Sequence, residues 1–415
     1  MSEVTLPIDH VGVRGDGIGH HDGKRIFVPF AAPGDVLSVK LGSGNREGVP
    51  GEIVSIVTPG ARVTPPCQHF GDCGGCALQH LSPDAYAETK VSWLRHALAL
   101  QGLGEVSVAP LLRLAQQTRR RARLSLEPRR VGFHARASHR IVDMRACFVL
   151  HPRLFALVEP LRQLSGKILG KRGEGAATLT LAQSGVAVLL DLPETPGLAA
   201  LEELAEFATG LDLARLAWRA KDGTVTPVAL RRKAQVAFSG VTIDLPEDSF
   251  LQASEEADRV LTEQVLAALG PASRIADLYA GLGTFTFALA KQGSVHAVEG
   301  DAASVAALRQ AASRAKLDRV TAEQRDLAKR PLSIDELAGY DAVVFDPPRV
   351  GAAPQCRTLA LSAVKRIVAV SCSPASFARD ARQLVDGGYR LAAVQPVDAF
   401  IWSAQLELVA TFVRI

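Results

Sequence analysis

Apolar and polar residues follow a pattern that changes near residue 270. From there on, short apolar runs are separated by amphipathic stretches of helical length. Strands that alternate with helices in this way are typical of a doubly wound α/β sheet, in which ligands bind outside the carboxyl ends of the strands. The pattern predicts strands at 274–280, 295–298, 319–324, 340–345 and 366–372, and two further strands at 389–397 and 406–415.

Residues with reactive or polar side chains follow each of the first five strands. A glycine turn at 281–284 comes first, then Glu299, Asp326, Asp346 and Cys372. Two prolines after Asp346 stop the strand and fix the loop that carries the carboxylate. Because the carboxyl ends of parallel strands meet at one edge of a sheet, we expect these residues to share one active site.

The glycine turn and Glu299 point to a cofactor. Glycines let the backbone approach a ligand, and Glu299 lies about where an acidic residue contacts ribose hydroxyls in nucleoside-binding α/β folds. The turn lacks the third glycine of a dinucleotide fingerprint, so a pyrophosphate is disfavoured. S-adenosylmethionine, a nucleoside with a cationic sulfonium group, is the predicted cofactor.

Length and composition indicate a protein of two or three domains. The chain has 415 residues and no apolar run of about 18 residues, the length that a membrane span needs. Its first residues resemble no secretion signal, so we expect a cytoplasmic location without membrane contact. Glycine-punctuated runs at 25–28, 36–41 and 52–57 predict a small β-barrel over residues 1–60.

Cysteine spacing predicts a metal centre. In a reducing compartment, six cysteines favour metal or catalytic roles over disulfides. Three close thiols and one remote thiol suit an iron–sulfur cluster better than zinc, although His69 and His80 leave a zinc site open. We expect a structural role, because none of these thiols is near a predicted strand end of the C-terminal domain. The proposed ligands are Cys67, Cys73, Cys76 and Cys147.

A basic segment lies between residues 113 and 145. It is opposed locally only by Glu127 and Asp143, and arginine forks match phosphates and stack on bases. RNA is the predicted partner, and a solvated face with structural ion pairs is the alternative. The arginines are Arg113, Arg119, Arg120, Arg121, Arg123, Arg129, Arg130, Arg136, Arg140 and Arg145.

Taken together, these motifs resemble the RNA (uracil-5-)-methyltransferases of the bacterial 23S ribosomal RNA type over nearly the whole chain. The resemblance implies a TRAM-type barrel at 1–60, a central α+β RNA-binding domain with a [4Fe-4S] cluster at 61–235 and a class I (Rossmann-like) methyltransferase domain at 236–415. Besides the cysteines, it rests on Phe250-Leu251-Gln252, Asp277-Leu278-Tyr279, Asp346-Pro347-Pro348-Arg349, Ser371-Cys372-Ser373-Pro374 and Leu406-Glu407.

The resemblance also assigns roles. Cys372 matches a nucleophile that adds to carbon 6 of uracil, and Glu407 matches the base that later removes the proton from carbon 5. Glu407 would be desolvated in its apolar run, whereas simple alternation would make it a surface charge. Ribosomal RNA is the expected substrate, with transfer RNA as the alternative, and the target base is flipped out. A monomer is expected. The implied cofactor contacts are Gln252, Tyr279, Thr284, Glu299, Asp326 and Asp346.

Several positions depart from the family pattern, including Thr284, Ser254, Ser373 and Gln405. They concern substrate positioning more than the thiol and carboxylate, so they put the target nucleotide in doubt. Two rival functions stay open: an amine-directed methyltransferase, which needs no thiol, and a non-catalytic iron–sulfur protein that binds RNA. Retention of activity without the Cys372 thiol indicates the first, and failure to bind S-adenosylmethionine the second.

Overall fold

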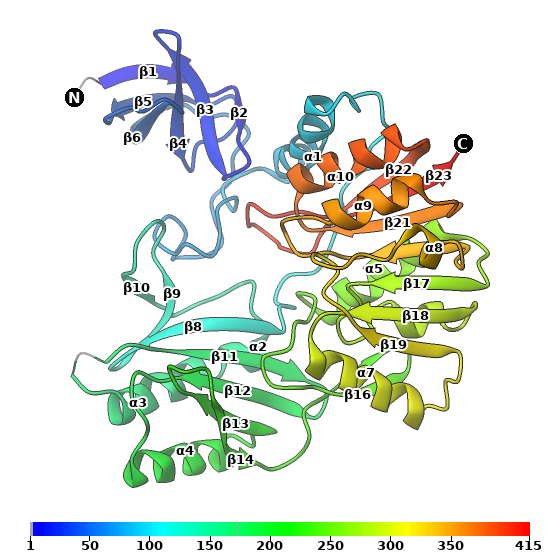
Figure 1. Ribbon diagram of the computed structural model, residues 1–415. Coiled ribbons are helices and arrows are strands. Elements are labelled where there is room, and N and C mark those ends of the chain that lie inside the picture. The colour runs from blue at the N-terminus through cyan, green and yellow to red at the C-terminus, as the bar shows by residue number, and fades with distance from the viewer. Residues whose placement is uncertain (1–2, 172) are drawn as a thin grey trace.

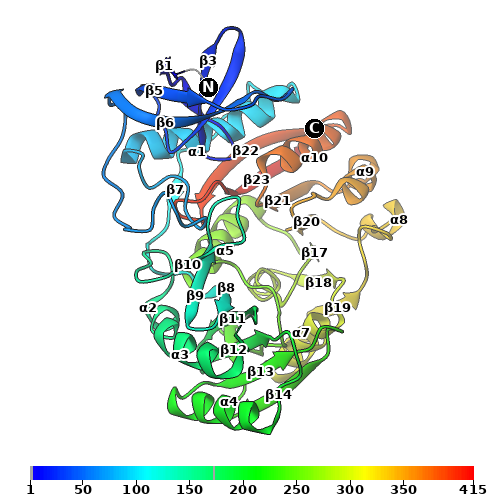
Figure 2. The same cartoon turned by 90° about the vertical axis from the view of Figure 1, so that its left-hand side faces the viewer.

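The computed structural model describes residues 3–171 and 173–415, and within them the strands form sheets of six, seven, two and eight strands. The N-terminal sheet and the central sheet lie at opposite ends of the molecule, and the eight-stranded C-terminal sheet lies beside both (Figures 1 and 2). None of the helices in the described ranges combines the length and apolar character needed to cross a membrane.

The N-terminal sheet is curled, because β6 pairs with β5 along most of its length and with β4 at its start. Its inward-facing residues, such as Leu6, Val28 and Leu37, form a small core of their own. The prediction of strands in this region is confirmed. The strands are β1 (Glu3–Pro7), β2 (His10–Val11), β3 (Asp16–His21), β4 (Lys24–Pro29), β5 (Val36–Leu41) and β6 (Val49–Thr58).

Helix α1 (Pro83–Leu100) follows the loop that carries three of the cysteines. Ser82 caps its start, since the Ser82 hydroxyl accepts the N–H of Ala85 at 3.4 Å. The helix packs against α10 (Pro374–Asp386), and β7 (Leu112–Arg113) then joins the edge of the C-terminal sheet beside β22 (Tyr389–Asp398). The chain therefore contacts the C-terminal sheet before it builds the central one.

The central sheet is mainly antiparallel, with helices packed on one side. Leu124, Leu179, Leu190 and Leu216 from its strands share a core with Leu161 from a helix. The elements are β8 (Arg121–Glu127), β9 (Arg130–His134), β10 (Ile141–Asp143), α2 (Pro152–Phe155), α3 (Val158–Ile168), β11 (Gly175–Ala182), β12 (Gly185–Asp191), α4 (Leu198–Gly210), β13 (Arg215–Arg219) and β14 (Val225–Leu230).

The C-terminal sheet has the order β19-β18-β17-β20-β21-β23-β22-β7, and its first five strands are parallel. The predicted strands are confirmed, and a hairpin, β15 (Gln235–Phe238) and β16 (Val241–Asp244), precedes them. The remaining elements are α5 (Glu255–Leu269), β17 (Arg274–Leu278), α6 (Thr286–Leu289), β18 (Ser294–Glu299), α7 (Ala302–Arg314), β19 (Val320–Gln324), α8 (Ile334–Leu337), β20 (Ala342–Phe345), α9 (Ala353–Leu361), β21 (Arg366–Ser371) and β23 (Glu407–Arg414).

Helices cover both faces of this sheet. Alternate residues of one strand face different cores: Ile275 packs with Leu261 of α5, and Ala276 packs with Phe377 of α10. Strand order reverses between β17 and β20, because β18 and β19 lie on one side of β17 and β20 and β21 on the other. Such a switch point leaves a crevice at the carboxyl ends of the strands, where ligands bind in doubly wound sheets.

Candidate active site and cysteine cavity

Cys372 and Glu407 face each other across two neighbouring strands. Strand β21 runs antiparallel to β23 with Ser371 paired to Leu408, so the same register places Cys372, the next residue along, opposite Glu407. Directly opposite residues in an antiparallel pair point to the same face of the sheet. The sheet therefore brings a thiol and a carboxyl group together at the edge where β17, β18 and β20 also end.

Glu407 is buried, with 3% of its surface exposed. Burial raises its pKa well above the ordinary value, the nearby Asp346 carboxyl raises it further, and the Arg349 guanidinium opposes both. Its Oε2 atom has no hydrogen-bond partner among the described residues. The alternative of a surface charge is wrong: β23 is buried from Glu407 to Phe412, because α5 packs against it on one face of the sheet and α10 on the other, so alternation does not report exposure.

Asp346 lies directly after β20, and Gln252 donates a hydrogen bond from Nε2 to its Oδ2 at 2.9 Å. Burial raises the pKa of Asp346 to about 7, and the bond from Gln252 lowers it. Gln252 is itself held in place, since its backbone carbonyl accepts a bond from Arg120 Nε at 3.2 Å. The carboxyl group thus has a fixed hydrogen-bond partner and a pKa above its ordinary value.

Cys372 is partly buried at the end of β21. Burial raises the pKa of its thiol to about 11; Glu407 and Asp346 raise it as well, and Arg349 lowers it. Without bound substrate, the Cys372 thiol is therefore protonated at neutral pH. A nucleophilic role requires that this proton leave when substrate is bound.

Arg349→Gln should slow alkylation of Cys372 at every pH below the thiol pKa. Arg349 favours the thiolate, so its removal raises the pKa further and lowers the reactive fraction. The measurement is the pH dependence of iodoacetamide labelling, followed by mass spectrometry of the peptide containing Cys372. Arg259→Gln removes an exposed arginine that pairs with Glu263 and should leave the profile unchanged. Equal profiles for wild type and Arg349→Gln contradict the assigned electrostatics.

The glycine turn after β17 is joined to Glu299 at the end of β18. The Gly281 N–H donates to Glu299 Oε2 at 2.9 Å, and the Asp301 N–H donates to Oε1 at 2.8 Å. Gly283 has a φ of +92°, and a Cβ there would lie 2.6 Å from the Phe287 ring, so only glycine fits. Each Glu299 oxygen keeps capacity to accept a second hydrogen bond from a ligand hydroxyl.

The other expected cofactor residues are placed less uniformly. Tyr279 follows β17 in a left-handed conformation with φ of 59°, and it is partly buried. Thr284 ends the glycine turn and is partly buried. Asp326 lies on the surface beyond β19, where it pairs with Lys329 at 3.2 Å. The structure brings Gln252, Asp346, Cys372 and Glu407 together most closely, while Asp326 lies at the rim.

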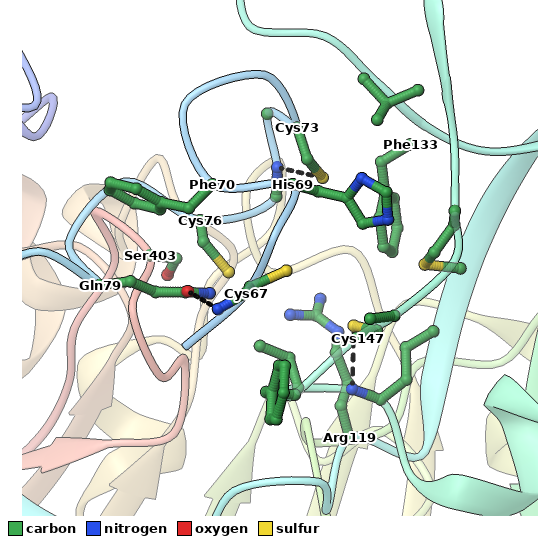
Figure 3. Close-up of a pocket in the computed structure, with 18 of the residues that line it drawn as sticks. Cys67, His69, Phe70, Cys73, Cys76, Gln79, Arg119, Phe133, Cys147 and Ser403 are labelled. Carbon is green, nitrogen blue, oxygen red and sulfur yellow. Dashed lines mark hydrogen bonds between the residues drawn. The ribbon is translucent and has the colours of Figure 1, made fainter. Parts of the chain in front are cut away.

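The four expected metal ligands line one cavity of about 260 Å³ (Figure 3). All six cysteines of the chain are free thiols. Within residues 3–171 and 173–415, no group of three or more His, Cys, Asp or Glu side chains is arranged so that it could hold a metal ion. Thiolates are the ligand type that iron–sulfur clusters take, so the donor chemistry of the four cysteines fits a cluster. His80 is bound elsewhere, with Nε2 3.1 Å from the Ala31 carbonyl oxygen.

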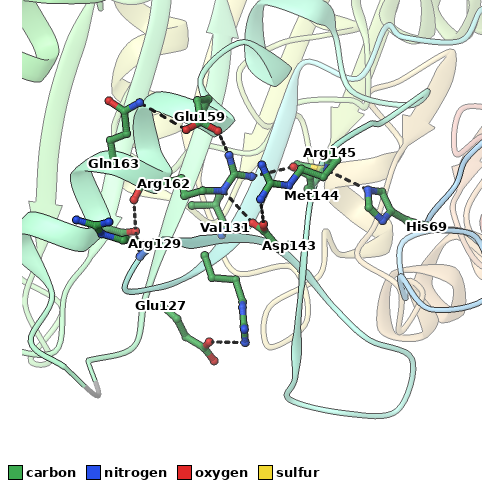
Figure 4. A network of polar contacts seen from close by, with 12 residues as sticks. His69, Glu127, Arg129, Val131, Asp143, Met144, Arg145, Glu159, Arg162 and Gln163 are labelled. Atoms are coloured by element: carbon green, nitrogen blue, oxygen red, sulfur yellow. Dashed lines mark hydrogen bonds and ion pairs between the residues drawn. The ribbon is translucent and has the colours of Figure 1, made fainter.

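A polar network fixes the segment that leads to Cys147 (Figure 4). Arg162 on α3 donates to Asp143 at 2.9 Å and to the Met144 carbonyl at 3.0 Å. The Arg145 N–H donates to Nε2 of His69 at 2.9 Å, so the segment is joined to the cysteine loop. The His69 side chain thus supports the cavity by accepting a hydrogen bond from the backbone of Arg145.

The cysteines were expected to lie away from the strand ends of the C-terminal domain, and this expectation is wrong. Ser403 and Gln405, which immediately precede the start of β23, also line the cavity. The Trp402 carbonyl accepts bonds from the N–H groups of Ala77 at 2.7 Å and Leu78 at 3.1 Å. The cysteine cavity therefore adjoins the loop that enters Glu407, because long-range packing brings together segments that no local pattern connects.

Many arginines of the basic segment have carboxylate partners from distant parts of the chain. Arg120 forms a buried pair with Asp258 at 2.6 Å, and Arg119 lies over the Phe400 ring at 5.8 Å. The alternative of structural ion pairs therefore holds for much of the segment. The exposed or partly exposed pairs are Arg121–Asp248, Arg123–Asp191, Arg130–Glu127, Arg136–Asp16, Arg140–Asp72 and Arg145–Asp143.

Two residues beside the site, Arg349 and Phe250, had no role predicted from the sequence. Arg349 follows the second proline after Asp346 and acts on the pKa values of both Cys372 and Glu407. Phe250 is 66% exposed only two residues before Gln252. An aromatic ring that stays exposed beside a polar site is suited to stacking on a base. Both residues belong to sequence motifs, Asp346-Pro347-Pro348-Arg349 and Phe250-Leu251-Gln252, in which other residues had been given roles. Membership of these motifs was the signal that could have identified them.

Comparison with known proteins places this geometry in a family. The family model for tRNA (uracil-5-)-methyltransferases matches residues 225–413. An uncharacterised RNA methyltransferase of Caulobacter vibrioides is 39% identical over 99% of both chains. The 23S rRNA (uracil(1939)-C(5))-methyltransferase of Chromohalobacter salexigens is 35% identical over 99% of this chain and 89% of the relative.

A solved structure is similar over its whole length. The tRNA (uracil-54, C5)-methyltransferase of Pyrococcus abyssi, in complex with S-adenosyl-L-homocysteine, superposes with a TM-score of 0.78 at 25% identity, covering 99% of this chain and 100% of that one. The expected methyltransferase fold is thereby confirmed. The chain belongs to the RNA (uracil-5-)-methyltransferase family and is an S-adenosylmethionine-dependent RNA methyltransferase.

Proposed function

We propose that this enzyme methylates carbon 5 of a uridine in 23S ribosomal RNA through a covalent adduct with Cys372. The observation that carries the proposal is the register of β21 and β23, which sets the Cys372 thiol opposite the buried Glu407 carboxyl. A nucleophile and a base that lie side by side at one edge of the sheet suit a reaction that adds a group to a ring and later removes a proton from it.

The proposed steps balance in protons and electrons. The thiol passes its proton to solvent, and the thiolate forms a bond to carbon 6 of uracil, which moves an electron pair to carbon 5 and the adjacent carbonyl oxygen. Carbon 5 then takes the methyl group from the sulfonium, and S-adenosylhomocysteine leaves. Glu407 removes the proton from carbon 5, the bond from sulfur to carbon 6 breaks, and methylated uridine leaves; the proton on Glu407 then returns to the thiolate and restores the starting state.

Asp346 and Glu299 support this sequence from the cofactor side. Asp346, with a pKa of about 7, is partly protonated at neutral pH and can donate a hydrogen bond to the oxygen that gains charge. Glu299 would accept ribose hydroxyls, and Gln252, Tyr279 and Thr284 would complete the cofactor pocket. Asp326 would contact the adenine end from the rim.

Methyl-labelled S-adenosylmethionine tests the substrate and the reaction. The protein is incubated separately with purified unmodified ribosomal RNA and transfer RNA, and the labelled nucleoside is identified after digestion. Labelled 5-methyluridine in ribosomal RNA supports the proposal. Labelled 5-methyluridine found only in transfer RNA would mean that transfer RNA is the substrate. Label on a base amino group supports the amine-directed alternative instead.

The other assignments are part of the same proposal. The curled N-terminal sheet would be a TRAM domain, residues 61–235 the RNA-binding domain and residues 236–415 the catalytic domain. Arginines without a full set of carboxylate partners would contact RNA phosphates. Such contacts bind RNA without reading its sequence. We further propose a monomer located in the cytoplasm.

We propose that Cys67, Cys73, Cys76 and Cys147 hold a [4Fe-4S] cluster. The support is that the four thiols line one cavity although Cys147 is far away in the sequence. When bound, the cluster would supply a covalent cross-link between the cysteine loop and the central sheet. The surrounding residues would fix its position through the contacts of His69 and Arg162.

Cys147→Ala should remove iron and sulfide and lower the thermal unfolding midpoint by about 5 °C or more, because the cross-link is lost. RNA affinity should fall with it. The measurements are iron and sulfide content, thermal unfolding and RNA binding of anaerobically purified protein. Cys356→Ala changes a fully buried thiol outside the cavity and should keep the iron. Normal stability and RNA binding in iron-free Cys147→Ala protein contradict the structural role.

A further inference from the structure

The loop at residues 399–406 joins the end of β22 to Glu407, the first residue of β23. Its path therefore sets where the Glu407 carboxyl enters the sheet. A general base must lie within hydrogen-bond reach of the proton that it removes, so small displacements of this loop bear directly on catalysis. The assigned catalytic residues do not explain what holds this loop in place.

Lys90, from the middle of α1, holds both ends of this loop. Its side chain is fully buried, and its ammonium group donates to the Asp398 carboxylate, to the Phe400 carbonyl at 2.9 Å and to the Gln405 carbonyl at 2.8 Å. An ammonium group has three N–H donors, so every one of them is used. Two bonds lie at the start of the loop and the third lies two residues before Glu407.

Tyr86, one helical turn earlier on α1, completes the arrangement. Its hydroxyl donates to the second oxygen of Asp398 at 2.6 Å and accepts the N–H of Trp402 at 2.8 Å. Asp398 is only 2% exposed. A buried ion pair contributes little net stability compared with apolar packing, and it is best explained where it specifies one geometry. Here the geometry specified is that of the loop.

The same loop contacts the cysteine cavity. Trp402 accepts two backbone bonds from Ala77 and Leu78, directly after Cys76, and Gln405 lines the cavity wall. Lys90 thus binds the carbonyl of Gln405, a residue that lines the cysteine cavity and stands two positions before Glu407 in the sequence. Disturbance of the loop from either side would be expressed at Glu407.

We propose that Lys90 is a positioning residue for Glu407, which it holds in register with the reacting carbon through loop 399–406. The inference rests on the proposed function, because it gives Lys90 a task only in the proton-removal step. Thiol addition and methyl transfer depend on Cys372 and the cofactor, and they should proceed without Lys90. Loss of Lys90 should therefore delay the breakdown of the methylated adduct rather than its formation.

The test is a single-turnover reaction with methyl-labelled S-adenosylmethionine and unmodified ribosomal RNA, in which label in the protein–RNA adduct and label in free RNA are measured over time. Lys90→Met keeps the chain length and removes all three donors. We expect adduct formation within about threefold of wild type and release slowed by about tenfold or more. Labelled adduct should accumulate, as it should in Glu407→Gln.

Two further variants keep the test decisive if Lys90→Met folds poorly. Lys90→Met leaves the Asp398 carboxylate buried without its cation, so the double variant Lys90→Met with Asp398→Asn removes the charge and keeps an acceptor for Tyr86. It should accumulate adduct in the same way. Lys167→Met makes the same substitution at an exposed lysine that pairs with Glu203 and should behave as wild type.

The outcomes separate this inference from the proposed function. If wild type and Glu407→Gln give labelled adduct but both Lys90 variants release product at the wild-type rate, Lys90 has no positioning role. If both Lys90 variants lose adduct formation and release in equal proportion, Lys90 is only structural and the inference is overturned. If no variant forms an adduct and wild type makes no 5-methyluridine, the proposed function itself fails.

Discussion

Cys372→Ala should abolish methylation of RNA, with a loss on the order of 10⁴-fold or more, the scale expected when the nucleophile of a covalent mechanism is removed. Carbon 5 of uracil is too weak a nucleophile to attack the sulfonium until carbon 6 carries the thiolate. The alanine side chain cannot form that bond, and the remaining groups of the pocket only bind and orient. The measurement is labelled 5-methyluridine formed per enzyme, from wild type and variant under the same conditions.

The fold and cofactor site should survive this substitution. Cys372 lies at a strand end and is partly buried, so its truncation leaves the core of the sheet intact. S-adenosylmethionine binding, measured by calorimetry, should stay within about threefold of wild type. Cys356→Ala, at a fully buried thiol without an assigned role, is the matched control and should keep its methylation activity. Methylation that survives Cys372→Ala points to the amine-directed class.

Much of the C-terminal sheet could be predicted because its signals are local. Short apolar runs identify the strands of a buried parallel sheet, and turn-forming residues mark their ends, so Asp346 and Cys372 could be placed at one edge without any tertiary information. Glu407 could not be placed in this way. Alternation along β23 suggests an exposed side chain, and only the helices that pack on both faces of the sheet bury it.

The basic segment and the cysteine loop show what local patterns omit. Arg120 and Arg136 look unopposed in the sequence, yet Asp258 and Asp16 reach them from far along the chain. The cysteines look remote from the catalytic strands, yet loop 399–406 lies against them. Charge and spacing along a chain identify which groups need partners, and only the tertiary structure determines which partners they obtain.

Glu407→Gln should trap the reaction after methyl transfer. Glutamine keeps the shape of the side chain but cannot accept a proton at neutral pH, so the proton stays on carbon 5 and the bond from Cys372 to carbon 6 persists. We expect turnover to fall roughly 10²- to 10⁴-fold, the usual effect of losing a general base. The measurement is a denaturing gel, on which label from the S-adenosylmethionine methyl group should migrate with a protein–RNA complex.

The buried location of Glu407 explains why its carboxylate should be an effective base. Burial and Asp346 raise the pKa of its carboxyl, which makes the deprotonated form a stronger base than an exposed glutamate. Glu203→Gln alters an exposed carboxylate that pairs with Lys167 and should show normal turnover without trapped complex. If Glu407→Gln forms neither complex nor product, the carboxylate acts earlier, as the base that activates the thiol. If it turns over normally, another group removes the proton, and the opposition of Cys372 and Glu407 across β21 and β23 serves the fold alone.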